Sequence, residues 1–117
     1  MPSRARKWTL RVRHILDAIA ESFRFAAGMS RGEFDADAKT VKAVVCNLGI
    51  IGEAARHIPK RIETSYPKIP WAQMRGMRNH LIHGYDVIDL EIVWKVLRDE
   101  LPQVVPLLER VLEEAAE

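Results

Sequence analysis

The chain has 117 residues, a formal net charge of +2, 48% hydrophobic residues and one cysteine. This length can bury a core of its own, so we expect a single domain over residues 1–117. The lone Cys46 excludes an internal disulfide and a zinc site built from several thiolates. No apolar run approaches the roughly 20 residues of a membrane span, and no apolar leader stretch follows the basic start. We therefore expect a cytoplasmic protein that does not bind a membrane.

Helical spacing of apolar residues predicts a first helix that ends near Gly28, with Trp8, Val12, Ile15, Leu16, Ile19, Phe23 and Ala26 on one stripe. Asp35 or Asp37 could cap a second helix, which ends at Pro59. This second helix is apolar on most faces, so we expect it to be buried both in the core and in a subunit interface.

Residues 59–70 form a connector that can hold a short helical turn at Lys60–Ser65. A third helix is expected from Trp71 to Gly84, and Asp89 can cap the last one. Two prolines, Pro102 and Pro106, fall inside that last helix and predict a kink or a short break. No alternating pattern indicates a strand. The expected fold is all-α, an antiparallel up-and-down bundle of four to five helices.

Basic and acidic residues are unevenly distributed. Between Arg56 and Arg78 there are six basic residues and one acidic residue, Glu63, whereas residues 99–117 hold six acidic residues and one basic residue. Such asymmetry can steer an anionic partner towards one face. The alternative is a set of solvated helix faces, which we favour for the acidic C-terminal run.

The most informative stretch is Arg78-Asn79-His80-Leu81-Ile82-His83-Gly84-Tyr85. Arg78 and His83 are five residues apart, or about 140° around an ideal helix, so they converge only if the helix ends or a second subunit completes the site. Metal-free RNA cleavage needs a base, an acid and a cation, which histidine and arginine supply near neutral pH. From the spacing alone, a helix cap with a histidine bonded to a carbonyl remains the stronger alternative.

Three further segments strengthen the functional interpretation, in the expected order: residues 51–59, 66–71 and 89–94. Together with Arg-x4-His-x-Tyr, they resemble the HepT-like toxins of the HEPN superfamily over residues 8–108. The resemblance implies a HEPN-like helical bundle, commonly a homodimer with the motif in a cleft at the interface.

The same resemblance implies roles for individual residues. Arg78 and His83 would be the catalytic pair of metal-independent RNA cleavage, with Asn79 in support. HepT-like toxins are encoded beside a nucleotidyltransferase antitoxin, MntA, which attaches AMP to the motif tyrosine, here Tyr85. An AMP group beside Arg78 would compete with an RNA phosphate.

Other residues keep two interpretations. Glu53 either hydrogen-bonds Arg78 or a partner helix and so supports the site, or is merely exposed. A set of basic residues either guides RNA to the cleft or belongs to an ordinary solvated loop: Lys60, Arg61, Lys68 and Arg75. The four histidines lack a supporting carboxylate cluster, so we expect neither a metal site nor a cofactor.

The sequence thus predicts a metal-independent endoribonuclease toxin of a type VII toxin–antitoxin system. It would act on RNA at a composite site in a homodimer and be silenced by AMPylation of Tyr85. The alternative is a non-catalytic helical module that binds a nucleotide or a partner and is associated with a nucleotidyltransferase.

Overall fold

The computed structural model describes residues 7–83 and 87–116. In chain order the elements are helices α1 (Lys7–Phe25), α2 (Arg31–Ala36), α3 (Ala38–Ala55), α4 (Lys60–Ser65), α5 (Trp71–Arg75) and α6 (Met77–Leu81), strands β1 (Ile82–His83) and β2 (Val87–Ile88), helix α7 (Leu90–Lys95), the π-helical turn η2 (Val96–Glu100) and helix α8 (Leu101–Ala116). The all-α prediction is confirmed.

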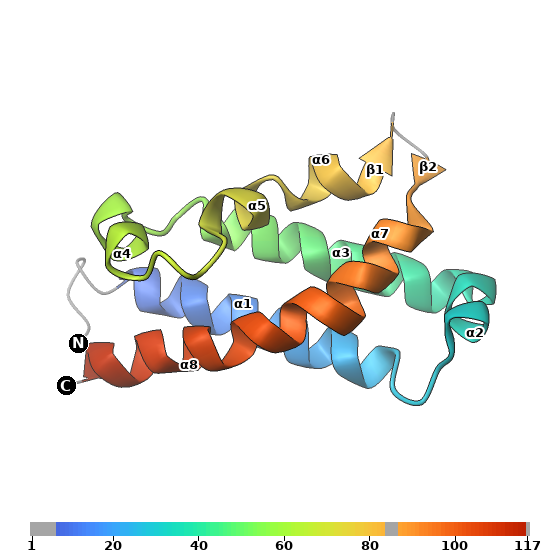
Figure 1. The fold of residues 1–117 in the computed structure, drawn as a ribbon, viewed down its shortest axis with the longest axis horizontal. Coiled ribbons are helices and arrows are strands. Elements are labelled where there is room, and N and C mark those ends of the chain that lie inside the picture. The colour runs from blue at the N-terminus through green and yellow to red at the C-terminus, as the bar shows by residue number, and fades with distance from the viewer. Residues whose placement is uncertain (1–6, 84–86, 117) are drawn as a thin grey trace.

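Three long helices form the body of the molecule. In Figure 1, α1 and α3 run side by side, α8 lies in front of α1, and α5 and α6 lie along the upper side of α3. The predicted stripe of α1 faces this core, with Val12, Ile15 and Ile19 buried. No helix in the described ranges is both long enough and apolar enough to cross a membrane.

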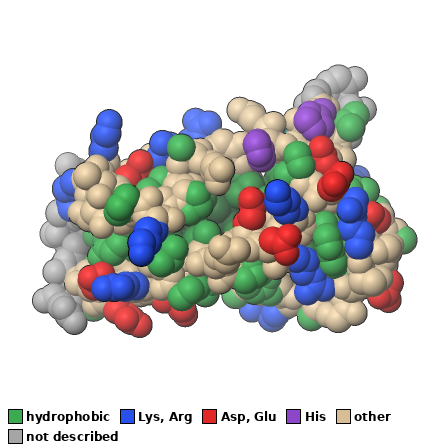
Figure 2. Space-filling model, in the orientation of Figure 1, with side chains coloured by type: hydrophobic (Ala, Val, Ile, Leu, Met, Phe, Trp, Pro, Cys, Tyr) green, Lys and Arg blue, Asp and Glu red, His purple; other side chains and the backbone are tan. Residues whose placement is uncertain are grey.

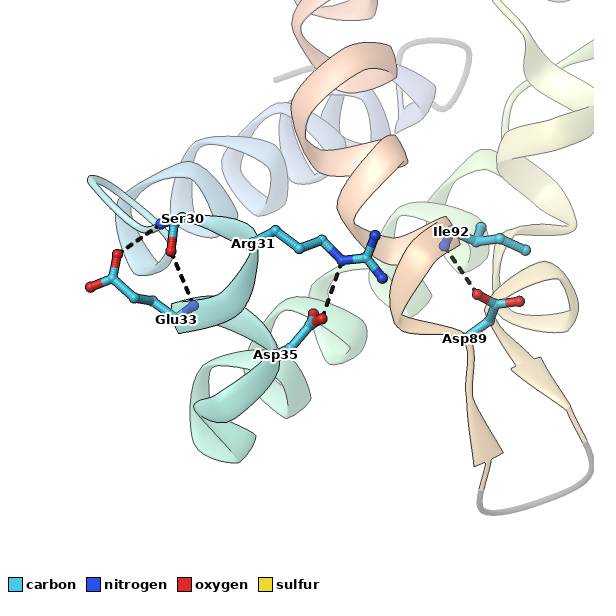
Figure 3. A network of polar contacts seen from close by, with 6 residues as sticks. All are labelled: Ser30, Arg31, Glu33, Asp35, Asp89 and Ile92. Carbon is cyan, nitrogen blue, oxygen red and sulfur yellow. Dashed lines mark hydrogen bonds and ion pairs between the residues drawn. The ribbon is translucent and has the colours of Figure 1, made fainter.

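The predicted helix ends are largely confirmed. Asp37 caps α3 by accepting a hydrogen bond from the Thr40 backbone N–H at 3.1 Å. Gly28 follows α1 with φ +76°, a left-handed conformation that a side chain would strain. The short helix α2 was not expected. It starts at a capping box in which Ser30 and Glu33 each bind the other's backbone N–H, as Figure 3 shows.

The expected helix from Trp71 to Gly84 is wrong in its details. It is split into α5 and α6 at Gly76, and it ends at Leu81, because Ile82 already has extended dihedrals. A two-residue antiparallel pairing follows, with Ile82 opposite Ile88 and His83 opposite Val87. The expectation of no strand is therefore also wrong. Gly84 lies outside the described residues.

The irregularity predicted from the two prolines is a π-helical turn that precedes them. In η2 the Leu101 N–H bonds the Val96 carbonyl, five residues back. Pro102 and Pro106 cannot donate such a bond, and α8 continues through both. The side-chain amide of Gln103 bonds the Asp99 carbonyl at 2.8 Å, which satisfies an acceptor near the break.

Gly52 allows the α5–α6 segment to lie against α3. A β-carbon at this position would be 3.0 Å from the Met74 carbonyl oxygen, 3.5 Å from that of Arg75 and 3.6 Å from the Met77 β-carbon. The contact with the Met74 carbonyl would be tighter than nine in ten real β-carbon contacts, so a side chain at position 52 would force the α5 backbone to shift by a few tenths of an ångström.

Replacing Gly52 with alanine should therefore destabilise the fold by about 1–3 kcal/mol, because the α5 backbone must move away from α3. Urea unfolding followed by circular dichroism measures the change. The control is Gly32→Ala in α2, where an added β-carbon meets nothing within 4 Å. This control should not lose stability. Equal stability of Gly52→Ala and Gly32→Ala would contradict the close approach.

Candidate functional site

A groove of about 1030 Å³ lies beside α3 in the described part of the chain. One wall is α3 and the other is formed by α5, α6 and the short strands. The lining residues are Lys42, Val45, Cys46, Gly49, Ile50, Gly52, Glu53, Arg56, Arg75, Arg78, Asn79, Leu81, Ile82 and Ile88. The groove combines an apolar floor with four basic side chains, a surface suited to a flexible polyanion.

Arg78 and Asn79 reach this groove because of how α6 packs. Met77 and Leu81 are four residues apart, share one face of the helix and are both buried. The three residues between them are exposed, and two of these, Arg78 and Asn79, line the groove. An exposed guanidinium in such a groove can bind two oxygens of one phosphate.

Glu53 also lines the groove, and it forms an ion pair with His57. Its carboxylate lies 3.6 Å from the His57 imidazole, one turn further along the chain, and the Glu53 side chain is 70% exposed. In a single chain Glu53 is therefore largely exposed, and its contact with a partner helix stays a prediction.

The four proposed RNA-guiding residues do not lie together. Arg75 lines the groove and forms an ion pair with Glu63, which ties α5 to α4. Lys60 and Arg61 are exposed on α4 and do not line the groove. Lys68 lies at a separate hollow of about 350 Å³ between α5 and α8. Only Arg75 of this set is placed to act at the groove, and its charge is partly neutralised.

His80 and His83 take different positions. Histidine side chains gather at the upper edge of the face shown in Figure 2, over α6 and β1. His80 lines the hollow beside α8, with Met77 and Val104, and not the groove. His83 follows the groove-lining Ile82 on β1, and successive strand residues point to opposite faces, so one chain alone does not direct His83 into the groove.

His83 is held by a carboxylate. Its Nε2 atom lies 3.2 Å from Oδ2 of Asp89, while Oδ1 of Asp89 accepts the backbone N–H of Ile92 at 3.1 Å and caps α7. Figure 3 shows this cap. The Ile92 hydrogen bond, followed by that of His83, holds the pKa of Asp89 below its ordinary value of 3.8.

The sequence analysis missed three residues of this region. Lys42 on α3 and Arg56 at its C-terminal end line the groove about four turns apart, and the sequence assigned neither a role at the site. Asp89 was expected only as a cap, and its contact with His83 was not foreseen. A carboxylate six residues after a histidine was the available signal. Tyr85, the predicted modification site, lies outside the described residues.

The chain is similar in sequence to known proteins over most of its length. The HepT-like family, described as "Ribonuclease HepT-like", matches residues 15–111. A protein of Thermococcus cleftensis, named as a candidate ribonuclease HepT, is 37% identical over 76% of this chain and 84% of its own. A protein of Methanocaldococcus jannaschii, named as a candidate RNase, is 34% identical over 86% and 83%. Another of that description, from Caldanaerobacter subterraneus, is 32% identical over 86% and 89%.

The chain therefore belongs to the HepT-like family of the HEPN superfamily, an all-α fold. The comparison with solved structures gives no significant match.

The capping carboxylates predict how stability depends on pH. Helix-cap hydrogen bonds lower the pKa values of Glu33, Asp37 and Asp89 in the folded protein. A lowered folded pKa stabilises the fold above the ordinary pKa, and this contribution disappears as the pH falls through the folded value. The urea midpoint should thus fall as the pH is lowered from about 5 towards about 2.

Asp37→Asn keeps a capping oxygen but does not titrate, so its urea midpoint should fall less steeply over the same range. Asp17→Asn, in the middle of α1, is the control and should follow the wild type. Parallel curves for wild type and Asp37→Asn would show that the cap does not contribute.

Proposed function

We propose that this protein is an endoribonuclease that cleaves RNA without a metal ion, with Arg78 and His83 as its catalytic residues. The observation that carries the proposal is the groove beside α3, where Arg78 and Asn79 project from α6 over an apolar floor. Its relatives' names and the family description support the same activity. RNA would lie along the groove with its phosphates on the basic side chains that line it.

The proposed reaction uses the RNA's own 2′-hydroxyl. His83 as a neutral imidazole removes the 2′ proton, the 2′ oxygen attacks the adjacent phosphorus, and the bond to the 5′ oxygen breaks as that oxygen receives a proton from the imidazolium so formed. The products are a 2′,3′-cyclic phosphate and a free 5′-hydroxyl. Arg78 would bind the non-bridging oxygens where negative charge develops. DNA lacks the nucleophile and would not be cut.

The proposed site is completed by a second copy of the chain. The groove floor exposes apolar surface from α3, and Ile50 in it is 44% exposed. Burying such a surface against a symmetric partner is favourable. His83 is not among the residues that line the groove of its own chain, and a homodimer would let motif residues from two chains meet around one RNA strand.

Family membership also supports a biological context. We propose that the protein is the toxin of a type VII toxin–antitoxin system in the cytoplasm, paired with a nucleotidyltransferase antitoxin. The antitoxin would attach AMP to Tyr85, two residues after His83. An added phosphate beside the motif would repel RNA phosphates and occupy Arg78.

Purified protein should cleave a mixed RNA pool in the presence of EDTA and leave cyclic phosphate ends. His83→Ala should lower the rate by about 10²- to 10⁴-fold, the usual contribution of a positioned acid or base. Arg78→Lys should also lose activity, because lysine keeps the charge but not the two-pronged contact. His80→Ala is the matched control and should cleave like the wild type, since His80 lies at the other hollow.

Full activity of a folded His83→Ala protein would contradict the catalytic role of His83. If no variant and no wild-type sample cleaves RNA, and intact mass shows that Tyr85 is unmodified, the protein would instead be a non-catalytic helical module that binds a nucleotide or a partner.

A further inference from the structure

The hairpin register places His83 and Asp89 on one face. Ile82 pairs with Ile88 and His83 with Val87 in the antiparallel ladder. Asp89 is therefore the diagonal neighbour of His83, two residues beyond its direct partner, and diagonal neighbours share a face within reach of long side chains. The distance of 3.2 Å between Nε2 and Oδ2 is the consequence of this register.

Every polar group of Asp89 takes part in a hydrogen bond or ion pair. Its backbone N–H donates to the Leu81 carbonyl at 2.8 Å, and its carbonyl accepts from Val93 at 3.0 Å. Its Oδ1 is occupied by the Ile92 N–H, which leaves Oδ2 for His83. Val93 is fully buried, so this network joins an exposed histidine to the core. The His83 side chain is 61% exposed and would otherwise sample several rotamers.

A carboxylate can only accept hydrogen bonds, and its bond to His83 therefore selects one form of the ring. The pKa of Asp89 is lowered, which keeps its carboxylate ionised well below neutral pH. The atom that faces it, Nε2, must then carry a hydrogen. In the neutral imidazole this leaves the lone pair on Nδ1.

We infer that Asp89 is a positioning residue that fixes His83 in the Nε2–H form and makes Nδ1 the atom that exchanges protons with RNA. As a base, Nδ1 takes the 2′-hydroxyl proton, and the ring becomes an imidazolium whose Nε2–H remains bonded to Asp89. As an acid, Nδ1 gives its proton to the departing 5′ oxygen and the ring returns to the Nε2–H form. The catalytic part of this inference rests on the proposed function.

The form of the ring can be measured without any activity. In uniformly ¹⁵N-labelled full-length protein at alkaline pH, two-bond correlations between ring protons and ring nitrogens distinguish the two neutral forms. The wild type should show His83 as Nε2–H. Asp89→Asn can keep the cap through its amide oxygen but presents an N–H₂ group to the ring, so it should shift His83 towards the Nδ1–H form. A wild-type ring in the Nδ1–H form would overturn the inference.

Steady-state kinetics test whether the contact between Asp89 and His83 contributes to cleavage. Asp89→Asn should lower kcat by about 100-fold, as expected for a misoriented catalytic group, with a much smaller change in KM. Asp89→Ser keeps a capping oxygen but loses the contact with His83, and it should show the same loss. Asp37→Asn is the control, because Asp37 caps α3 in the same way, through the Thr40 N–H, at the start of a different helix. Circular dichroism confirms that each variant is folded.

The outcomes separate the two proposals. Folded Asp89→Asn and Asp89→Ser proteins that cleave as fast as Asp37→Asn would overturn the positioning role. A wild type in the Nε2–H form that cleaves no RNA would overturn the proposed function, and with it the catalytic part of this inference, while the hydrogen bond would stand. A changed pH profile of cleavage in Asp89→Asn alone would support the role, since loss of a cap does not alter it.

Discussion

The contact between α3 and the backbone of α5 at Gly52 determines where the candidate site lies. Because no side chain separates them, the Met74 and Arg75 carbonyls lie directly on α3. This places α6 beside the exposed face of α3 and turns Arg78 and Asn79 into the groove. Helix α3 is apolar on two faces. One face packs against α1 in the core, and the other forms the floor of the groove.

A second constraint, the cap of α7, controls the histidine end of the motif. Asp89 closes the short hairpin through its bond to Leu81, starts α7 and binds His83 with its remaining oxygen. One side chain therefore couples helix initiation, strand register and the orientation of an otherwise exposed imidazole. A substitution of Asp89 therefore changes the helix cap, the strand pairing and the His83 contact at once. Comparison with a substitution at another helix cap is needed to separate these effects.

Much of this arrangement could be predicted from the sequence. The periodicity of α1, the cap at Asp37, the turn at Lys60–Ser65 and the irregularity near Pro102 are local signals. The break at Gly76 and the strands could not be predicted, because Met74, Met77 and Leu81 also fit one continuous helix and the close packing at Gly52 is a tertiary effect. The motif residues were identified by resemblance, whereas Asp89's contact with His83 depends on hairpin register.

The most direct test of the central claim is complementation between two inactive proteins. Arg78→Ala and His83→Ala proteins are each assayed alone on RNA in EDTA, and then after mixing under conditions that let subunits exchange, with sedimentation confirming dimers. If a homodimer unites motif residues from two chains, mixed dimers retain one arginine and one histidine, and cleavage should reappear on mixing. Dimers that exchange subunits yet remain inactive would contradict a composite ribonuclease site.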